Sequence, residues 1–192
     1  MLFPTFLKLG GKRVLMVGAG PVAAGKLRAL LDAGARVTVV APEVVPAIAS
    51  APVDVLRRPF EPSDLDGVSY VVAAAPPEVN RAVAEAADPR GLFVNAVDDL
   101  ASASAYAGAV LRRAGITIAI STDGDAPALA GLAREALEAL LPEDLEEWMA
   151  CAREARRHWL REGVPMAERR PLLLAALNQL YERRAALVGG GH

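Results

Sequence analysis

The sequence predicts an α/β protein built on a doubly wound parallel sheet. Between residues 14 and 97, short apolar runs typical of strands buried on both faces alternate with segments of helical periodicity. The intervals between these runs are those that right-handed strand–helix–strand crossovers need. In a sheet of this kind, ligands bind beyond the carboxyl ends of the strands.

The first strand–helix–strand unit contains a glycine turn. Strands are predicted over residues 14–17 and 37–40, with a helix between them, and Gly18 and Gly20 form the turn that opens this helix. Such a turn lets backbone N–H groups approach a pyrophosphate at a helix N-terminus. Ala23 is small enough for close helix–strand packing at the third glycine position. We therefore expect a Rossmann-like, dinucleotide-binding unit; the alternative is a tight turn that binds no nucleotide.

The remaining elements continue the alternation. We expect strands over residues 53–56, 68–75 and 92–97, helices over 42–50 and 78–87, and a turn or a single helical turn over 61–65. The carboxyl ends of parallel strands meet at one edge of the sheet, so four stretches are expected to converge on one crevice: residues 18–22, 41–43, 73–76 and 95–99. Asp98 and Asp99 are predicted to be cleft residues on this ground, and Ala74 a cofactor contact.

The segment after the sheet is predicted to be largely helical. Residues 101–113 are small and alanine-rich, and a strand is expected over residues 116–121. Helices are expected over residues 128–141 and 144–161, followed by a helical segment from Pro165 that is broken at Pro171 and ends near Leu187.

Composition restricts the class of protein. The net charge of −2 argues against a nucleic-acid-binding protein. The single cysteine, Cys151, excludes a disulfide framework and suits a reducing compartment. No apolar run reaches roughly 18 residues and no signal peptide is evident, so we expect a cytoplasmic protein without a membrane span. The sequence contains no cluster of His and Cys residues that would predict a metal site.

The end of the second strand favours NAD over NADP. Position 41 is an alanine, and the nearest acid is Glu43, 23 residues after Gly20, where a ribose partner is plausible. Neither Arg nor Lys directly follows the strand; Arg57 and Arg58 come much later. The alternative is that Glu43 is only a solvated residue at a helix start.

Several motifs follow one another in a fixed order: Leu2-Phe-Pro-Thr-Phe-Leu-Lys-Leu9, Val14–Arg28, Gly34–Pro42, Pro59-Phe60 with Asp64-Leu65, Ala73-Ala-Ala75 with Asn80, Asn95-Ala-Val-Asp98 and Ile118–Thr122. From about residue 2 to Pro142, this order resembles the precorrin-2 dehydrogenase family, which includes the dehydrogenase module of sirohaem synthases. The resemblance implies NAD-dependent oxidation of precorrin-2, a tetrapyrrole with eight carboxylates, to sirohydrochlorin. Some family members also insert Fe²⁺.

The resemblance also assigns site residues. The family's essential aspartate falls on Asp98, which would act as a general base or as a carboxylate close to the metal. The family's dinucleotide contacts fall on Gly18, Gly20, Pro21, Val22, Pro42 and Glu43. The alternative role for Asp98 is a cap at the end of a strand. A homodimer is implied as well.

We therefore divide the chain into four parts: a Rossmann domain over residues 1–112, a small dimerisation segment over 113–142, a C-terminal helical region over 143–188 and a disordered tail over 189–192. Four arginines fall at helical spacing on the helix expected over residues 144–161: Arg153, Arg156, Arg157 and Arg161. They would suit an acidic substrate or form a solvated surface.

Two stretches depart from the family pattern. The chain has Ser104-Ala105 and Gly108 where the family has Ser/Cys-Phe and a proline, and residues 122–126 replace a Ser/Thr-Gly-Gly turn and a following serine. These departures leave open a family member with an altered substrate. An NAD-binding regulatory module is a further alternative, because the fold alone does not separate such a module from an enzyme.

Overall fold

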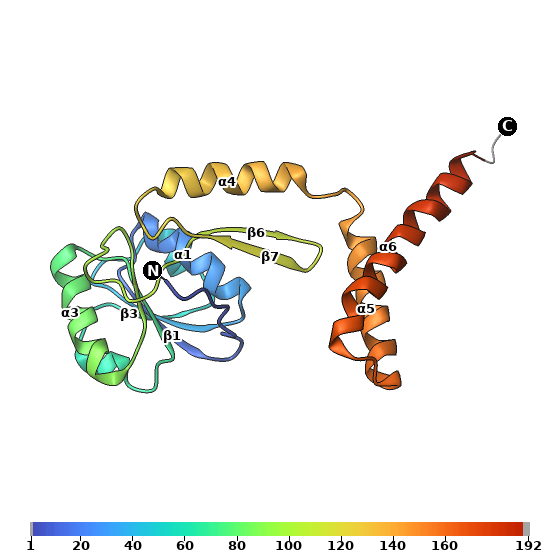
Figure 1. The fold of residues 1–192 in the computed structure, drawn as a ribbon. Coiled ribbons are helices and arrows are strands. Elements are labelled where there is room, and N and C mark those ends of the chain that lie inside the picture. The colour runs from blue at the N-terminus through green and yellow to red at the C-terminus, as the bar shows by residue number, and fades with distance from the viewer. Residues whose placement is uncertain (1, 190–192) are drawn as a thin grey trace. The chain divides into compact units, whose positions relative to one another are not determined.

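The computed structural model describes residues 2–189, with side chains up to residue 182. The chain forms two compact units. The first, here called the sheet unit, comprises the residues up to Gly108 together with Ser121–Pro127, and the second, the helical unit, comprises Ala109–Ile120 and the residues from Ala128 onward. Figure 1 shows the fold and labels several of these elements.

The sheet unit contains the predicted parallel sheet, with five strands in the order β3-β2-β1-β4-β5. The strands are β1 (Arg13–Val17), β2 (Arg36–Val40), β3 (Asp54–Leu56), β4 (Tyr70–Ala73) and β5 (Val94–Ala96), and all neighbours are parallel. The strand order reverses at β1, which pairs with β2 on one side and β4 on the other. The predicted α/β fold is confirmed, and its switch point lies at the end of β1.

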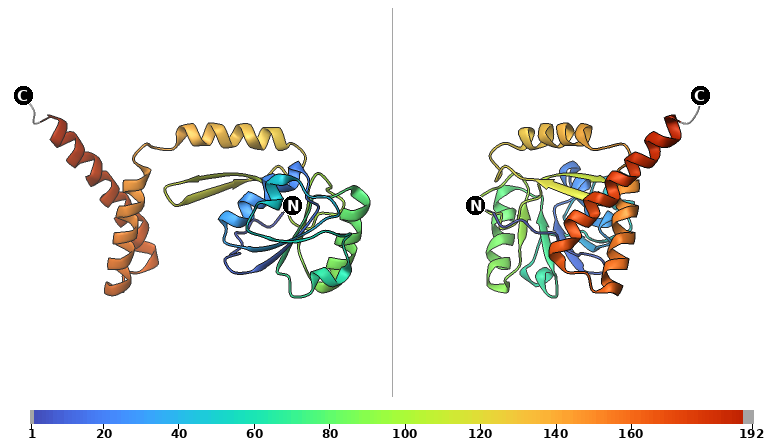
Figure 2. Two further views of the ribbon diagram at one scale, coloured as in Figure 1. Left: turned by 180° about the vertical axis from the view of Figure 1, so that it is seen from behind. Right: turned by 45° about the vertical axis from the view of Figure 1, so that its right-hand side comes forward.

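Helices cover both faces of the sheet (Figure 2). On one face, α1 (Pro21–Asp32) and α2 (Pro46–Ala49) pack on a cluster that includes Val14, Met16 and Val39. On the other face, α3 (Pro77–Ala87) and the 3₁₀ turn η1 (Pro62–Leu65) pack on a cluster that includes Leu15 and Val71. Successive residues of a strand point to opposite faces, and both faces are buried, which explains why the strands are continuous apolar runs.

The outer edge of β5 is covered by its own following segment. After a 3₁₀ turn η2 (Asp88–Arg90) and β5, the chain returns so that the Ser104 and Ala105 N–H groups both donate to the Val94 carbonyl, at 2.9 and 3.0 Å. The Ser104 hydroxyl accepts from the Val94 N–H at 2.9 Å, and the buried Asn95 side chain donates to the Ala105 carbonyl at 3.0 Å. These bonds satisfy an edge strand that would otherwise be open.

The helical unit begins with a β-hairpin, and the sequence predicts only the second of its two strands. Strand β7 (Ile116–Ile120) agrees with the strand predicted over residues 116–121, but its antiparallel partner β6 (Ala109–Arg113) lies in the stretch over residues 101–113, for which no strand is predicted. The expected domain boundary after residue 112 lies inside β6, whereas the first segment of the sheet unit ends at Gly108 and its second segment is Ser121–Pro127. Pairing with β7 makes β6 a strand, because only this pairing satisfies its backbone groups.

Three helices follow: α4 (Pro127–Leu140), α5 (Leu145–Glu162) and α6 (Met166–Gly189). The predicted break at Pro171 is wrong, because α6 runs through this proline. The proline lies in the second turn, where its ring removes a single backbone hydrogen bond. Trp148 and Tyr181 join α5 to α6 through an edge-to-face contact at 6.2 Å and an indole N–H to phenol hydrogen bond of 2.8 Å.

The described chain begins with an extended arm and ends with α6. Gly189 ends α6, and the rest of the tail expected to be disordered, residues 190–192, lies outside the described residues. Residues 2–9 form an extended arm without strand pairing, and Gly11 turns the chain into β1 with φ +70°. Across the described helices, none is both long and apolar enough to span a bilayer.

Candidate functional site

A cleft of about 740 Å³ opens at the carboxyl ends of β1, β2 and β4, at the switch point of the sheet. Its lining is apolar, and Glu43 is the one charged side chain among the described residues that form it. Six of the predicted cofactor residues line this cleft: Gly18, Gly20, Pro21, Pro42, Glu43 and Ala74. The seventh, Val22, is not part of the lining, and its side chain is 53% exposed.

Gly18 holds the turn after β1 against the end of β4. Its N–H donates to the Val40 carbonyl at 2.9 Å, and its φ of +97° lies in the left-handed region. A Cβ at this position would collide with the carbonyl group of Ala74 and approach the Ala75 nitrogen to 3.0 Å. Both the backbone angle and the close approach therefore require glycine.

Gly20 leaves space for a ligand at the N-terminus of α1. A Cβ built here meets nothing within 4 Å and would project into open space beside the cleft. No side chain of the described residues caps this helix, and Pro21 in its first position has no N–H. The Ala24 N–H already bonds the Gly20 carbonyl, so the N–H groups of Val22 and Ala23 remain as donors. This arrangement suits an anion, and a pyrophosphate fits it.

The end of β4 is fixed by a buried amide. Asn80, which is 2% exposed, accepts a hydrogen bond from the Ala75 N–H at 3.1 Å through its side-chain oxygen. Since Ala74 and Ala75 line the cleft, the first turns of α3 hold this wall in place.

The opposite wall contains residues that motif reasoning did not name as site residues. Val44, Val45, Pro59 and Phe60 line the cleft, and only the Pro59-Phe60 pair had been singled out, as part of the family resemblance. A broad apolar wall can contact the flat face of a nucleoside base. Sequence spacing alone gives no signal for it, because this wall is assembled from two loops that only the sheet order brings together.

An ion pair fixes the loop that carries Phe60. Asp64 accepts from both terminal guanidinium nitrogens of Arg58, at 2.9 and 2.5 Å, and from the Glu61 N–H at 2.9 Å. Arg58 also donates to the Pro59 carbonyl at 2.9 Å. Hydrogen bonding from Arg58 lowers the pKa of Asp64 below its usual range, and partial burial of the carboxyl group opposes this shift.

Asp98 lies on the loop beside the cleft rather than in its lining. The Val97 N–H donates to the Ala73 carbonyl at 2.8 Å, which keeps the end of β5 beside the end of β4. Asp98 then takes a left-handed conformation, with φ +57°, and its side chain is exposed. The next residue, Asp99, accepts from the Ser102 N–H at 3.2 Å and closes the turn. Three of the four stretches expected in one crevice thus form its lining, and residues 95–99 do not.

The unusual 122–126 turn packs on this same loop. The Thr122 hydroxyl accepts from the Ala126 N–H at 3.1 Å, and Gly124 has φ +90°. A Cβ on Gly124 would collide with the side chain of Leu100, which follows Asp99. The described residues contain no group of three His, Cys, Asp or Glu side chains placed to hold a metal ion.

Comparisons with known proteins agree with this geometry. A family model described as "Putative NAD(P)-binding" matches residues 5–109. Siroheme synthase 1 of Aeromonas salmonicida (strain A449) is 44% identical over 172 residues, which are 87% of this chain and 37% of that protein. Siroheme synthase of Photorhabdus laumondii subsp. laumondii is 38% identical over 193 residues, which are 98% of this chain and 40% of that protein. The chain therefore spans less than half the length of these curated relatives.

Among solved structures, the one named "SirC, precorrin-2 dehydrogenase" superimposes with a TM-score of 0.71 at 28% sequence identity. The match covers 91% of this chain and 88% of the other. The similarity thus extends beyond the dinucleotide-type sheet.

The Arg58–Asp64 pair predicts a pH-dependent stability. The pKa of Asp64 is lower in the folded chain than the roughly 3.9 of an unfolded aspartate, so the folded state binds fewer protons and acid favours unfolding. We expect the difference in free energy of unfolding between wild type and Asp64→Asn to be largest near neutral pH. It should shrink as the pH falls through the pKa of Asp64. Urea unfolding from about pH 7 to about pH 3 measures it.

Asp66→Asn is the matched control, since Asp66 is 71% exposed and lies 3.6 Å from Arg90. We expect its effect on the free energy of unfolding to be small at every pH. A constant difference between wild type and Asp64→Asn across the series would contradict a contribution from the Arg58–Asp64 pair.

Proposed function

Because the chain belongs to the precorrin-2 dehydrogenase family of NAD(P)-binding domains, we propose that it oxidises precorrin-2 to sirohydrochlorin with NAD⁺. The observation that carries the proposal is the similarity to SirC over 91% of the chain, combined with a cleft that fits a dinucleotide. When bound, NAD⁺ supplies the hydride acceptor.

Different residues of the cleft bind different parts of NAD⁺. The N–H groups of Val22 and Ala23 hold the pyrophosphate at the open side of Gly20. The Glu43 carboxylate accepts hydrogen bonds from ribose hydroxyls, and it repels a phosphate at the same place, which favours NAD over NADP. The apolar wall that includes Phe60 excludes water from the nucleoside base of the cofactor.

Asp98 serves as the general base. Removing a hydride from the macrocycle must be balanced by loss of a proton, and a carboxylate beside the cleft can accept it. Asp98 suits this role because its side chain is exposed while the loop that carries it is tied to β4 through Val97 and closed by Asp99. Its left-handed backbone is one that aspartate tolerates better than most residues.

A second candidate is a family member with an altered substrate. The observation that favours it is the 122–126 turn, which packs on Leu100 in the loop of Asp98 and carries the extra acids Asp123 and Asp125. Absorbance of the purified protein with precorrin-2, with and without NAD⁺, separates the two. Formation of sirohydrochlorin with matching NADH supports the proposal, and later addition of Fe²⁺ tests for iron insertion.

Gly20→Ala should weaken NAD⁺ binding without unfolding the chain. The φ of −83° suits alanine, and the added methyl group meets no protein atom within 4 Å, so it fills only ligand space. We expect the dissociation constant for NAD⁺ to rise about tenfold or more, measured by calorimetry, with the unfolding midpoint close to wild type. Gly25→Ala, in the middle of the same helix and equally open, is the control. Unchanged affinity in Gly20→Ala would remove this turn from the binding site.

Asp98→Asn should bind NAD⁺ normally and lose turnover. Asparagine keeps the shape of the side chain and tolerates the left-handed backbone, but it cannot accept the proton. We expect the rate of precorrin-2 oxidation to fall by about 100-fold or more, followed by NADH absorbance. Asp99→Asn, which keeps an oxygen for the Ser102 N–H, should retain most of the activity. An Asp98→Asn variant with wild-type turnover would exclude Asp98 as the base.

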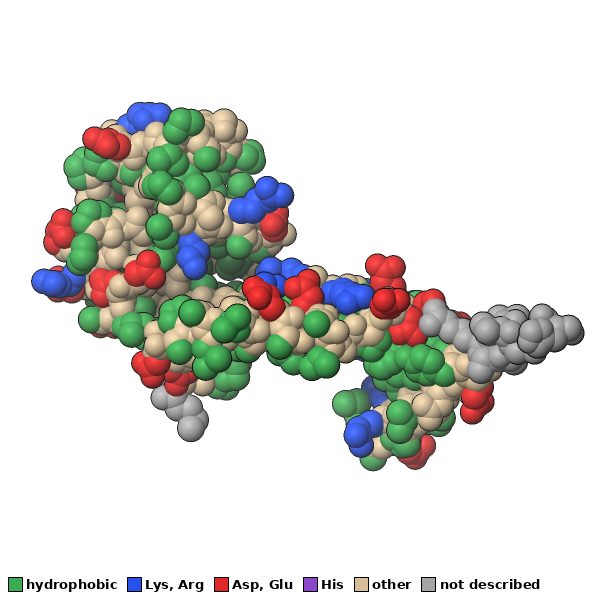
Figure 3. All heavy atoms as spheres, turned by 90° about the horizontal axis from the view of Figure 1, so that it is seen from above, with side chains coloured by type: hydrophobic (Ala, Val, Ile, Leu, Met, Phe, Trp, Pro, Cys, Tyr) green, Lys and Arg blue, Asp and Glu red, His purple; other side chains and the backbone are tan. Residues whose placement is uncertain are grey.

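The active form is proposed to be a homodimer that uses the segment after the sheet. On α4, exposed leucines form one side of the helix, with Leu132 63% and Leu140 78% exposed; Figure 3 shows apolar side chains along this helix. We expect light scattering to give twice the mass of one chain for wild type and the mass of one chain for Leu132→Glu/Leu140→Glu. Glu138→Gln, on the polar side of α4, is the control. A wild-type protein with the mass of one chain would contradict the proposal.

A further inference from the structure

Arg58 follows β3 at the side of the sheet unit where the ribose 2′-phosphate of NADP would be recognised. It lies two residues beyond β3, whose last residue, Leu56, pairs with Val40 at the end of β2. Two residues further on, Phe60 lines the cleft. In dinucleotide-binding sheets, the adenosine ribose lies beyond the second strand, and a nearby arginine there accommodates the 2′-phosphate of NADP. The chain thus has an arginine on this side of the sheet unit.

The structure keeps that arginine engaged. Both terminal guanidinium nitrogens of Arg58 donate to Asp64, and one of them also donates to the Pro59 carbonyl. The Asp64 side chain is 6% exposed, whereas that of Arg58 is 35% exposed. A fork-to-fork pair of this kind fixes the direction of the guanidinium as well as neutralising its charge.

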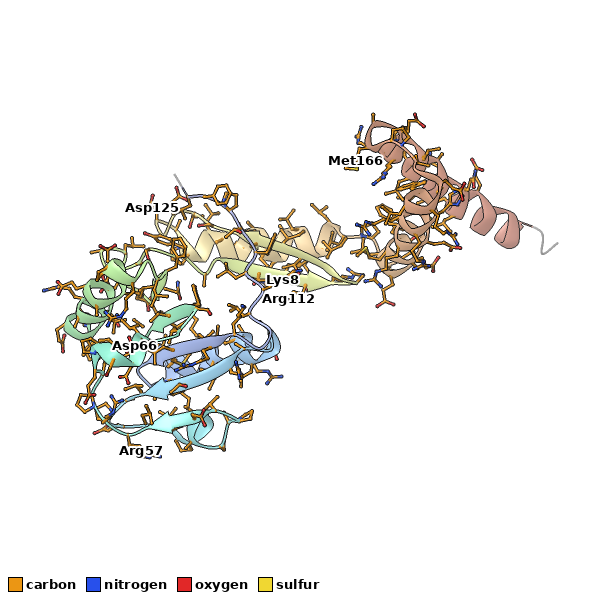
Figure 4. The ribbon with its side chains drawn as sticks, turned by 90° about the horizontal axis from the view of Figure 1, so that it is seen from below. Lys8, Arg57, Asp66, Arg112, Asp125 and Met166 are labelled. Carbon is orange, nitrogen blue, oxygen red and sulfur yellow. The ribbon has the colours of Figure 1, made fainter. Side chains whose placement is uncertain are left out.

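Arg57 does not take its place. Arg57 is exposed and lies at the outer edge of the sheet beside β3, which has no strand on its other side (Figure 4). The lining of the cleft itself contributes Glu43 and no cation among the described residues. A 2′-phosphate would therefore meet the Glu43 carboxylate with no free guanidinium to offset it.

We propose that Asp64 sets the preference for NAD over NADP by holding Arg58 in an ion pair, away from a ribose 2′-phosphate. The inference rests on the proposed NAD-dependent function and adds a specificity-determining residue outside the cleft lining. Asp64 acts through Arg58 and does not touch the cofactor, so it is a positioning residue. Removing its charge frees Arg58 to turn toward the phosphate.

Calorimetric titration with NAD⁺ and NADP⁺ tests this directly, without any turnover. In Asp64→Asn, the side-chain oxygen still accepts from the Glu61 N–H, but the carboxylate that binds Arg58 most closely is gone, which leaves only Glu61, 4.0 Å from the guanidinium. We expect the ratio of the NADP⁺ to the NAD⁺ dissociation constant to fall about tenfold. In Asp64→Asn/Arg58→Gln the ratio should return to the wild-type value, because the released guanidinium is removed as well.

Two further variants complete the design. Asp66→Asn makes the same charge change two residues away, in a residue paired with Arg90, and should leave the ratio at the wild-type value. Asp64→Ser, whose hydroxyl can also accept from the Glu61 N–H, replaces Asp64→Asn if the latter does not fold.

The outcomes separate this inference from the proposed function. Normal NAD⁺ affinity with an unchanged ratio in the Asp64 variant overturns the role of Asp64 alone. A lowered ratio that persists in the double variant also overturns it, because the gain then does not come from Arg58. A wild-type protein that binds neither dinucleotide overturns both the inference and the proposed function.

Discussion

The close approach of two backbone segments at the switch point of the sheet organises the site. The turn after β1 lies directly against the end of β4, where a Cβ on Gly18 would collide with the Ala74 carbonyl. This contact fixes the direction in which α1 leaves the sheet, so that its N-terminus faces the cleft. Asn80 secures the β4 side of the contact through the Ala75 N–H. An anion site made of backbone groups needs this rigidity, because no side chain can adjust to the ligand.

Charge is distributed so that the cleft remains slightly acidic. Glu43 is the one charged side chain among the described lining residues, and Arg58, two residues beyond β3, is engaged by Asp64. The same ion pair has a structural role, since it closes the loop that presents Phe60 to the cleft. One carboxylate thus links the shape of the apolar wall to the electrostatics that a cofactor phosphate would meet.

Only part of the structure of the loop that contains Asp98 could be predicted from the sequence. Its position at the end of β5 follows from the alternation of strands and helices, and its identity came from the resemblance to a known family. The sequence did not predict that the chain would turn at Asp98 in a left-handed conformation and leave its side chain exposed beside the lining. It also did not show that Gly124, far along the chain, packs on Leu100 of the same loop.

The sheet and the glycine turn could be predicted from the sequence alone, because they depend on local periodicity and on backbone rules for Gly18 and Gly20. Of the seven residues predicted to bind the cofactor, most of which came from the family resemblance, six line the cleft. The sequence missed β6, since this run of five residues, which ends in Arg112 and Arg113, becomes a strand by pairing with β7. It wrongly broke α6 at Pro171, because this proline lies in the second turn of the helix, where its ring removes only one backbone hydrogen bond. Only the tertiary structure assembled the apolar wall, since contacts between separate loops follow from strand order and not from spacing. The Arg58–Asp64 pair lies within one loop, but the sequence does not show which of the neighbouring charges form the close pair.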